Sequence, residues 1–212
     1  MPSSSSQKRP SKRPAAAPRL VARAAFPTRY GRFTLFAFQG RGPQEEAIAL
    51  VRGRLRGRSA PLVRVHSQCL TGDVLASIRC DCRAQLELSL KRIGKARSGV
   101  FLYLPQEGRG IGLMNKLRAY ELQDRGMDTV EANESLGFAA DARDYRFSAE
   151  ILKSLGARRI RLLSNNPQKV EQLERAGIRV VQRIPCQPRV PRISRSYLKT
   201  KKSKMGHLLE GI

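Results

Sequence analysis

Three of the four cysteines of this chain lie close together, in the spacing C-x10-C-x-C. They are Cys69, Cys80 and Cys82, within the stretch RVHSQCLTGDVLASIRCDC that ends at residue 82. Thiolates are soft ligands, and three of them held by one short loop favour zinc. The fourth cysteine, Cys186, is far along the chain. If the three thiolates bind one ion, residues 69–82 have to bend around it.

The sequence leaves open how such a site is completed. A structural zinc site has four protein ligands, whereas a catalytic site has three and keeps one position for water. The candidates for a fourth ligand are His66 and Asp81. If neither closes the shell, the pKa of a zinc-bound water falls to about 7. The alternatives are a structural site of three cysteines and His66, or buried thiols without metal. A disulfide is disfavoured, because a C-x-C pair is badly placed to bridge and nothing indicates secretion.

The charge of the chain is concentrated at its two ends. The formal net charge is +24, yet sixteen of the seventeen acidic residues lie between Glu45 and Glu174. Residues 1–25 are rich in Ser, Pro, Ala, Lys and Arg and are predicted to form a disordered basic tail. Their composition is also compatible with an organelle transit peptide. Residues 1–44 and 175–209 contain no Asp or Glu, and these cationic segments predict nonspecific, salt-dependent binding of polyanions.

The absence of a long apolar run excludes one class of protein. No stretch approaches the roughly 18 consecutive apolar residues that a membrane-spanning helix needs. We therefore expect no membrane span and a cytoplasmic location, with organelle targeting through residues 1–25 as the alternative.

Alternating strand and helix patterns from residue 99 to residue 182 predict an α/β fold. Strand patterns are found at residues 33–38, 62–66, 100–104, 159–163 and 178–182, and helical patterns at residues 84–96, 113–125, 145–155 and 167–176. We expect a three-layer α/β/α architecture with a mixed, largely parallel sheet, preceded by an N-terminal β portion and flanked by basic disordered tails. Residues 183–204, which are rich in Pro and Arg, are expected to be extended.

Two strand-to-helix junctions carry residues suited to binding an anion. EGRGIG, at residues 107–112, contains glycines that permit close backbone approach and opens a helix. Its spacing is not that of a dinucleotide fingerprint, and a purely structural turn is the alternative. SNNPQK, at residues 164–169, offers Ser164 as a helix cap and Lys169 as a positive charge for phosphate. Two such junctions at strand ends of one sheet predict a crevice for a phosphorylated ligand.

A third polar motif, Asp141-Ala142-Arg143-Asp144, comes just before a predicted helix. It suits a carboxylate general base beside a cation. The alternative is an acid at a helix N-terminus with a surface ion pair.

Four stretches of the chain together resemble GTP cyclohydrolase II. They are VRVHSQCLTGDVLASIRCDC, QEGRGIGLMNKLRAYELQDRG, DTVEANESLGFAADARDY and LLSNNPQKVEQLERAGI. The resemblance runs from about Phe26 to Gln182 and resumes in YLKTKKSKMGHLL at residues 197–209. It implies a catalytic domain at residues 26–182 and a basic C-terminal extension at residues 183–212.

The resemblance also implies a reaction. Enzymes of this family catalyse the first committed step of riboflavin biosynthesis. They open the imidazole ring of GTP at C8 and release formate, diphosphate and 2,5-diamino-6-(5-phosphoribosylamino)pyrimidin-4(3H)-one. The family suggests a homodimer, with one Zn²⁺ per subunit held by the three cysteines and Mg²⁺ accompanying the triphosphate.

The same resemblance assigns roles to individual residues. Asp141 matches the family's proposed proton acceptor and Arg143 a proposed nucleophile. Tyr120 matches a tyrosine near the guanine base of the substrate. A guanidinium of pKa above about 12 is a poor nucleophile, so a clamp on a phosphate is the chemical alternative for Arg143. The family's GTP-binding positions match Arg64, Val65, His66, Ser67, Gln68, Gln85, Glu107, Gly108, Arg109, Thr129, Ser164 and Lys169.

Two alternative functions follow from departures and from charge. Gln68 stands where the family usually has Glu, which leaves room for a homologue with another product or nucleotide. Pro105 stands where an Arg is common, a departure that bears on substrate affinity rather than on the reaction. The acid-free ends would suit a basic nucleic-acid-binding protein that reuses the fold.

Overall fold

The computed structural model describes residues 17–42, 45–57, 59–139, 141–188 and 195–211. The strands are β1 (Arg19–Thr28), β2 (Gly31–Gln39), β3 (Glu46–Arg52), β4 (Leu62–Ser67), β5 (Gly99–Leu104), β6 (Arg159–Leu163) and β7 (Arg179–Ile184). The α-helices are α1 (Cys82–Lys95), α2 (Leu113–Asp124), α3 (Thr129–Ser135), α4 (Arg146–Ser154), α5 (Pro167–Arg175) and α6 (Arg195–Met205). Two short turns, η1 (Leu70–Val74) and η2 (Glu107–Gly110), are π-helical and 3-10 helical.

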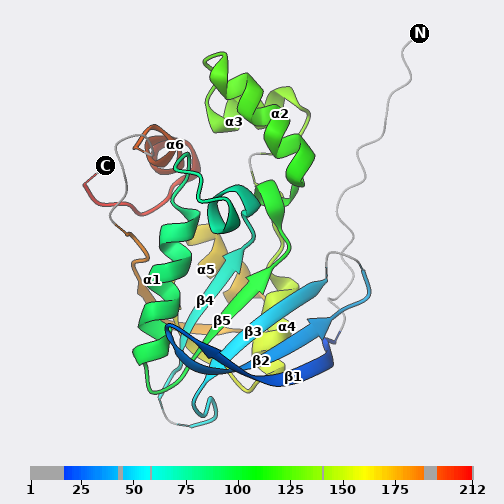
Figure 1. Ribbon diagram of the computed structural model, residues 1–212, viewed down its shortest axis with the longest axis vertical. Coiled ribbons are helices and arrows are strands. Elements are labelled where there is room, and N and C mark those ends of the chain that lie inside the picture. The colour runs from blue at the N-terminus through cyan, green and yellow to red at the C-terminus, as the bar shows by residue number, and fades with distance from the viewer. Residues whose placement is uncertain (1–16, 43–44, 58, 140, 189–194, 212) are drawn as a thin grey trace.

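The strands of the described residues form one mixed sheet in the order β1-β2-β3-β5-β4-β6-β7 (Figure 1). The pairs β1–β2, β2–β3 and β3–β5 are antiparallel. The pairs β4–β5, β4–β6 and β6–β7 are parallel. The predicted α/β fold with an N-terminal β portion is confirmed. The parallel half of the sheet consists of the strands that are each followed by a helix along the chain.

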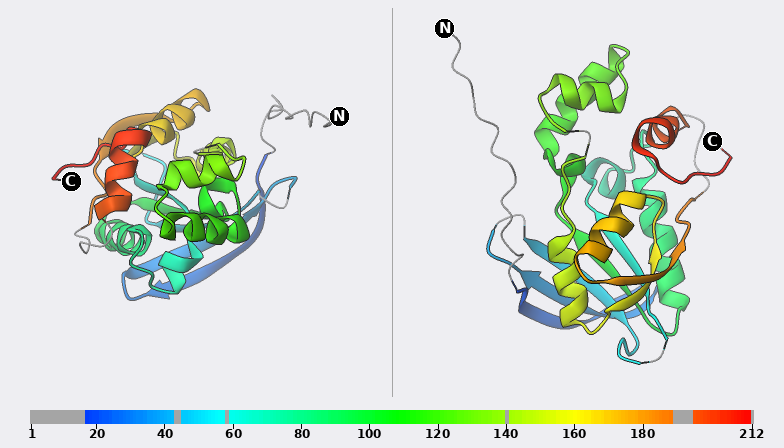
Figure 2. Two further views of the ribbon diagram at one scale, coloured as in Figure 1. Left: turned by 90° about the horizontal axis from the view of Figure 1, so that it is seen from above. Right: turned by 180° about the vertical axis from the view of Figure 1, so that it is seen from behind.

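Helices cover both faces of the sheet. Successive side chains of its central strands point to opposite sides, and those on both sides are apolar and need to be buried. Val63, Val100 and Leu102 pack on one face against α4 and α5 in the larger core cluster. Leu62 and Phe101 pack on the other face, where Leu90 and Ile93 of α1 cover them. Figure 2 shows these layers from above and from behind.

Two expectations about the ends of the chain are wrong. The tail expected to be disordered through residue 25 includes most of β1, which pairs with β2 along its whole length. Residues 183–204, expected to be extended, include the end of β7 and most of helix α6. Residues 1–16 and 189–194 lie outside the described residues.

The parallel strands position the functional residues. The carboxyl ends of β4, β5 and β6 lie at the same edge of the sheet, which faces α2, α3 and α6 (Figure 1). Each of these strands ends next to a sequence motif singled out above: the cysteine loop after β4, EGRGIG after β5, and SNNPQK after β6. Among the described residues, no helix combines the length and apolar character required to cross a membrane.

Candidate functional site

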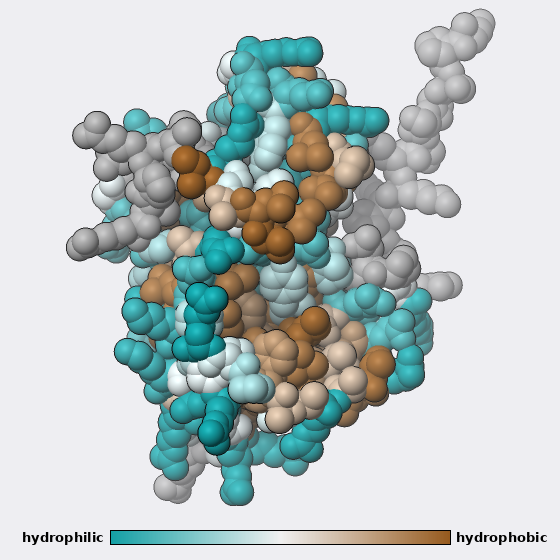
Figure 3. All heavy atoms as spheres, in the orientation of Figure 1, coloured by the Kyte–Doolittle hydropathy of each residue, from teal (hydrophilic) through white to brown (hydrophobic). Residues whose placement is uncertain are grey.

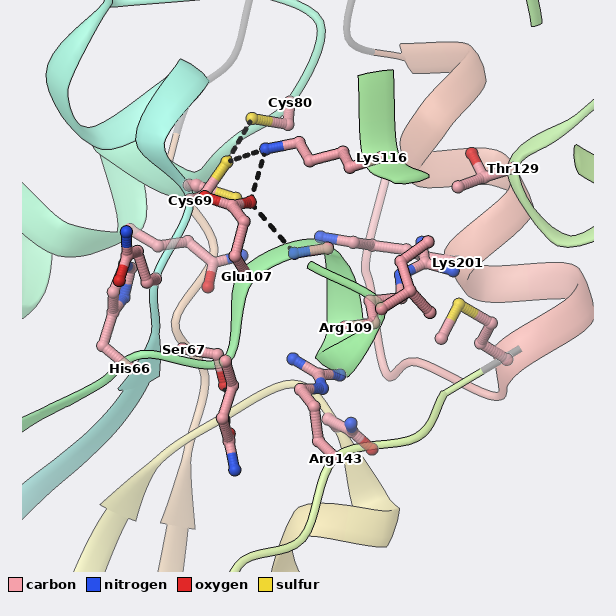
Figure 4. A pocket seen from close by; sticks show the side chains of 18 of the residues that line it. His66, Ser67, Cys69, Cys80, Glu107, Arg109, Lys116, Thr129, Arg143 and Lys201 are labelled. Atoms are coloured by element: carbon pink, nitrogen blue, oxygen red, sulfur yellow. Dashed lines mark hydrogen bonds and ion pairs between the residues drawn. The ribbon is translucent and has the colours of Figure 1, made fainter. Parts of the chain in front are cut away.

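A large cavity opens where the parallel strands end. It encloses about 1100 Å³, counting the part open to solvent, and its walls come from the cysteine loop, the two strand-to-helix junctions, α2, α3 and the C-terminal residues. Figure 4 shows side chains from these elements pointing into one space. The crevice predicted from the strand-to-helix junctions is therefore present.

The three cysteines of the motif meet at one side of this cavity. Their sulfur atoms all lie within 4.8 Å of one another, and the Sγ atoms of Cys69 and Cys80 are 3.7 Å apart. Zinc bound tetrahedrally at about 2.3 Å from each sulfur separates its ligands by roughly 3.8 Å. The sulfur positions therefore fit zinc, and the four cysteines are free thiols rather than disulfides.

A glycine makes room for this cluster. Gly72 lies in η1, and a Cβ atom built on it would be 2.8 Å from Sγ of Cys80 and 3.2 Å from Sγ of Cys69. Any side chain there would push the sulfur atoms apart. The loop between the first and second cysteine is thus shaped for the cluster by the absence of a side chain at this residue.

Both candidates for a fourth ligand are engaged elsewhere. Nε2 of His66 lies 3.1 Å from the carboxylate of Asp73. The Asp81 carboxylate accepts hydrogen bonds from Gln85 and, at 2.9 Å, from Nζ of Lys201. Within the described residues, the metal-ligating atoms that gather here come from the three cysteines alone. This arrangement has the ligand number of a catalytic zinc site rather than a closed structural one.

Lys116 of α2 places a positive charge beside the sulfur atoms. Its Nζ donates to Sγ of Cys69 at 3.1 Å, to Oγ1 of Thr71 at 2.8 Å and to Oε1 of Glu107 at 2.8 Å. Hydrogen bonds from Cys80 and Cys82, together with this cation, hold the pKa of the Cys69 thiol well below its usual value. These contacts stabilise the thiolate of Cys69, the form that binds metal, whereas the neighbouring thiols and burial raise the pKa values of Cys80 and Cys82.

Glu107 links the cysteine loop, residues 69–82, to η2 through hydrogen bonds. Its carboxylate accepts hydrogen bonds from the backbone N–H of Leu70 at 2.6 Å and of Gly108 at 2.9 Å. Gly108 and Arg109 both adopt left-handed backbone conformations, with φ of 60° and 62°. For Arg109 this conformation is uncommon, and such residues concentrate at functional sites. Both residues line the cavity.

Asp141 and Arg143 form a forked ion pair at the cavity. Nε of Arg143 donates to Oδ1 of Asp141 at 2.8 Å, and a terminal nitrogen donates to Oδ2 at 2.5 Å. Burial alone would raise the pKa of Asp141, but the hydrogen bonds and charge of Arg143 hold it below its ordinary value. Arg143 lines the cavity. The alternative of a solvated surface pair does not fit, because both side chains are largely buried.

The junction after β6 contributes a buried lysine. Nζ of Lys169 donates to the backbone oxygen of Val65 at 2.7 Å. Burial, followed by the charges of Arg64 and Arg143, lowers the pKa of Lys169 well below its usual value. An anion placed among these cations would reverse that shift. The helix cap expected at Ser164 is instead Asn166, whose side chain accepts from the backbone of Gln168.

Other predicted site residues occupy the same cavity. Tyr120 of α2 shares a hydrogen bond of 3.2 Å with Thr71, which places its hydroxyl beside the cysteine cluster. Gln85 links Arg64 to Asp81 by hydrogen bonds to both side chains. The remaining lining residues predicted from the sequence are His66, Ser67, Gln68, Thr129 and Ser164. Val65 contributes the backbone oxygen that accepts from Lys169.

Several lining residues were not predicted. Lys116 is one, and Lys201, Met205 and His207 of the C-terminal segment are others. The signal for the last three was the stretch YLKTKKSKMGHLL, whose resemblance indicated family membership but no role. The site thus draws residues from both the predicted catalytic domain and the predicted C-terminal extension.

Comparison with known proteins identifies one family. A model described as GTP cyclohydrolase II matches residues 19–185. GTP cyclohydrolase-2 of Hahella chejuensis is 53% identical over 189 residues, which cover 89% of this chain and 91% of that protein. GTP cyclohydrolase-2 of Buchnera aphidicola is 50% identical over 190 residues, covering 90% of this chain and 98% of the relative.

A second group of relatives is longer than this chain. The riboflavin biosynthesis protein RibBA of Endomicrobium trichonymphae is 51% identical over 186 residues, covering 88% of this chain but 46% of the relative. The chain therefore spans about half the length of the RibBA proteins that it matches. Among solved structures, a two-domain 3,4-dihydroxy-2-butanone 4-phosphate synthase from A. baumannii aligns at 20% identity over 70% of this chain and 34% of that one. The TM-score of 0.40 is too low to support a conclusion.

Proposed function

The chain belongs to the GTP cyclohydrolase II family, and from that premise we propose that it hydrolyses GTP in the first committed step of riboflavin biosynthesis. The reaction opens the imidazole ring at C8. The products are formate, diphosphate and 2,5-diamino-6-(5-phosphoribosylamino)pyrimidin-4(3H)-one. The observation that carries the proposal is the cluster of three sulfur atoms within 4.8 Å of one another, beside a cavity lined with cations.

Zinc would be held by Cys69, Cys80 and Cys82, and a nearby positive charge of the protein would balance the net negative charge of this site. When bound, zinc provides Lewis acidity and activates water at neutral pH. Three thiolates and one divalent ion sum to a charge of −1. The ammonium of Lys116, 3.1 Å from Sγ of Cys69, offsets that charge. Tyr120, held beside the cluster through Thr71, is positioned to orient the purine or a water molecule next to it.

The cationic side of the cavity would bind the triphosphate, accompanied by Mg²⁺. Arg143 and Lys169 present a guanidinium and an ammonium there, and Arg64 adds its charge to theirs. Guanidinium groups bind phosphate through paired N–H donors. We assign Arg143 to this clamping role, because a guanidinium is a poor nucleophile.

Movement of Arg143 onto a phosphate would also activate Asp141. In the described geometry the Asp141 carboxylate is held by Arg143, which lowers its pKa and makes it a weak base. When a phosphate takes over the guanidinium donors, the Asp141 pKa rises toward its ordinary value. Asp141 then becomes a better proton acceptor for the hydrolytic step. Binding of substrate would thereby switch on the base.

The test is release of formate from GTP by zinc-loaded protein with Mg²⁺. We expect formate and diphosphate in equal amounts, and neither product after removal of zinc. The analogue 7-deaza-GTP, whose five-membered ring lacks N7, should bind without yielding formate. A folded, zinc-loaded sample that yields neither formate nor a formylated product would refute the proposal. Retention of the formyl carbon in the product, seen by mass spectrometry, would instead identify a homologue with altered chemistry.

We also propose that the protein forms a homodimer. Large apolar residues are exposed on η1 and the adjoining loop and on α2, among them Val74, Leu75, Ile78 and Met114. Apolar side chains gather on the face seen in Figure 3. Exposed apolar patches mark interaction surfaces, and a second copy of the chain is the partner that the family implies. Light scattering should give twice the mass of the chain, whereas the mass of a monomer would contradict this proposal.

A further inference from the structure

The C-terminal residues line the cavity and are held there by an ion pair and a backbone hydrogen bond. We call residues 195–209, which comprise α6 and the residues after it, the C-terminal strap. Nζ of Lys201 forms a buried ion pair of 2.9 Å with Asp81, between the second and third cysteines. The backbone N–H of Leu208 donates to the oxygen of Asn165 at 2.9 Å. Figure 4 shows Lys201 reaching from this strap toward the other side chains of the pocket.

The strap carries His207 to the cavity wall. His207 lines the cavity, and its Nε2 atom is buried without a hydrogen-bond partner among the described residues. Its backbone is fixed, because its N–H donates to the oxygen of Lys201 at 3.0 Å. A buried ring nitrogen is normally hydrogen bonded, so this atom lacks a partner that a ligand can supply.

The charges around His207 indicate the chemistry of that ligand. Burial and then four cations, Lys201, Arg143, Arg109 and Lys169, lower the pKa of His207 to about 3. The ring is therefore neutral in the free protein and donates from only one nitrogen. Cations that converge on a buried polar atom in a cavity favour an anion with several oxygen atoms.

We propose that His207 is a nucleotide-contacting residue, which donates from Nε2 to the phosphate chain of the substrate. The strap thus completes the phosphate-binding side of the site, and Lys201 holds it in place through Asp81. This inference rests on the proposed function for the identity of the nucleotide. The phosphate chemistry follows from the side chains themselves.

The test measures binding of inorganic tripolyphosphate and of 7-deaza-GTP to zinc-loaded protein by calorimetry. His207→Ala should weaken both about ten-fold, the loss expected for one hydrogen bond to a charged group. His207→Gln, whose amide can still donate, should recover most of the affinity. The matched control is Lys199→Ala, which removes an exposed charge of the same C-terminal strap, on α6 and outside the cavity. It should change both dissociation constants by less than two-fold.

Zinc content and melting temperature separate contact from structure. If His207→Ala retains both and binds the two probes as tightly as the unaltered protein, the inference is wrong. An equal loss of affinity in Lys199→Ala would also overturn it, because general charge would then explain the effect. Failure of the proposed function looks different: the unaltered protein would bind both probes through His207 yet release no formate from GTP.

Discussion

At the scale of single residues, two cysteine substitutions can distinguish loss of a metal ligand from the general effect of losing a buried thiol. Cys80 belongs to the cluster, whereas Cys186 is buried apart from it against α1. We expect Cys80→Ser to lower zinc affinity by more than about 100-fold, because the hydroxyl is a poor replacement for a thiolate ligand. Formate release should disappear with the metal. Metal analysis and the formate assay measure the two effects.

Cys186→Ser provides the matched comparison for this substitution. It removes a buried sulfur without touching the cluster, so zinc content and formate release should persist. Full turnover by Cys80→Ser would refute the metal assignment. Loss of zinc from both variants would show that either substitution disturbs the fold.

Gly72 gives a second test that leaves all three thiols in place. A methyl group at this residue would lie 2.8 Å from Sγ of Cys80. Gly72→Ala should therefore spread the sulfur atoms and weaken zinc about 10- to 100-fold, in the range seen when the surroundings of a metal site are altered. Competition with a chromogenic chelator measures the change. Gly42→Ala is the control, since no atom of the described residues beyond its chain neighbours lies within 4 Å of its added methyl group. Equal zinc affinity in the two variants would contradict the steric account.

The sequence predicted the residues of the site unevenly, and the reason is distance along the chain. The cysteine spacing is local, and its thiols were identified before any fold was known. Lys116 contacts Cys69 across 47 residues, and Lys201 contacts Asp81 across 120. No local pattern distinguishes these lysines from the many others in a chain of this charge. Their roles appear only when the sheet and the strap bring them to the cavity.

At the scale of elements, contacts with distant parts of the chain overrode composition at both ends of the described chain. The residues of β1 are almost all exposed, so no apolar pattern of a buried strand marks them. Their conformation is fixed by backbone pairing with β2. Helix α6 follows a Pro-rich stretch, yet Leu198 and Lys201 are buried against the body of the protein. The α/β core was predictable because its strands are short apolar runs separated by amphipathic helices.

Helix α3 depends on a capping box that can be tested by substitution. The Asp128 carboxylate accepts from the backbone N–H groups of Val130 and Glu131, and Glu131 reaches back to the N–H of Asp128. Asp128→Ala should cost about 1 kcal/mol of stability, the usual effect of losing such a cap. Asp128→Asn keeps the cap and removes only the charge that faces Lys204. Urea unfolding at pH 7 should therefore rank the unaltered protein first, the Asn variant next and the Ala variant last.

The charge effect at Asp128 has a defined pH dependence. Burial alone would raise the Asp128 pKa, but Lys204 and the capped N–H groups together lower it below the ordinary value of 3.8. A depressed pKa in the folded state stabilises the protein above the unfolded-state pKa, and this contribution is lost as the pH falls through the folded-state pKa. The difference in stability between the unaltered protein and Asp128→Asn should therefore shrink below about pH 4. A difference that grows with acid would contradict the Lys204 pairing.

At the scale of the whole molecule, the sheet explains why motifs far apart in sequence share one site. The cysteine loop, EGRGIG and SNNPQK follow β4, β5 and β6, which are neighbouring parallel strands. Their carboxyl ends therefore meet at one edge, as in other open α/β sheets. This part of the site was predictable from the strand-helix alternation. The contribution of the strap was not, because nothing in the sequence places residues 195–209 over that edge.

The whole molecule carries a large excess of positive charge, and truncation can show which part of the chain binds polyanions. Residues 1–16 contain Lys8, Arg9, Lys12 and Arg13 and no acid. If this segment contacts polyanions, its removal should reduce the slope of log affinity against log salt for duplex DNA by up to about 4, since each neutralised phosphate contributes roughly 0.9. Fluorescence anisotropy over a range of salt concentrations measures that slope, and formate release should not change. Deletion through residue 25 is a different experiment, because it removes most of β1 and exposes β2. An unchanged slope in the shorter truncation would assign the binding to the folded body instead.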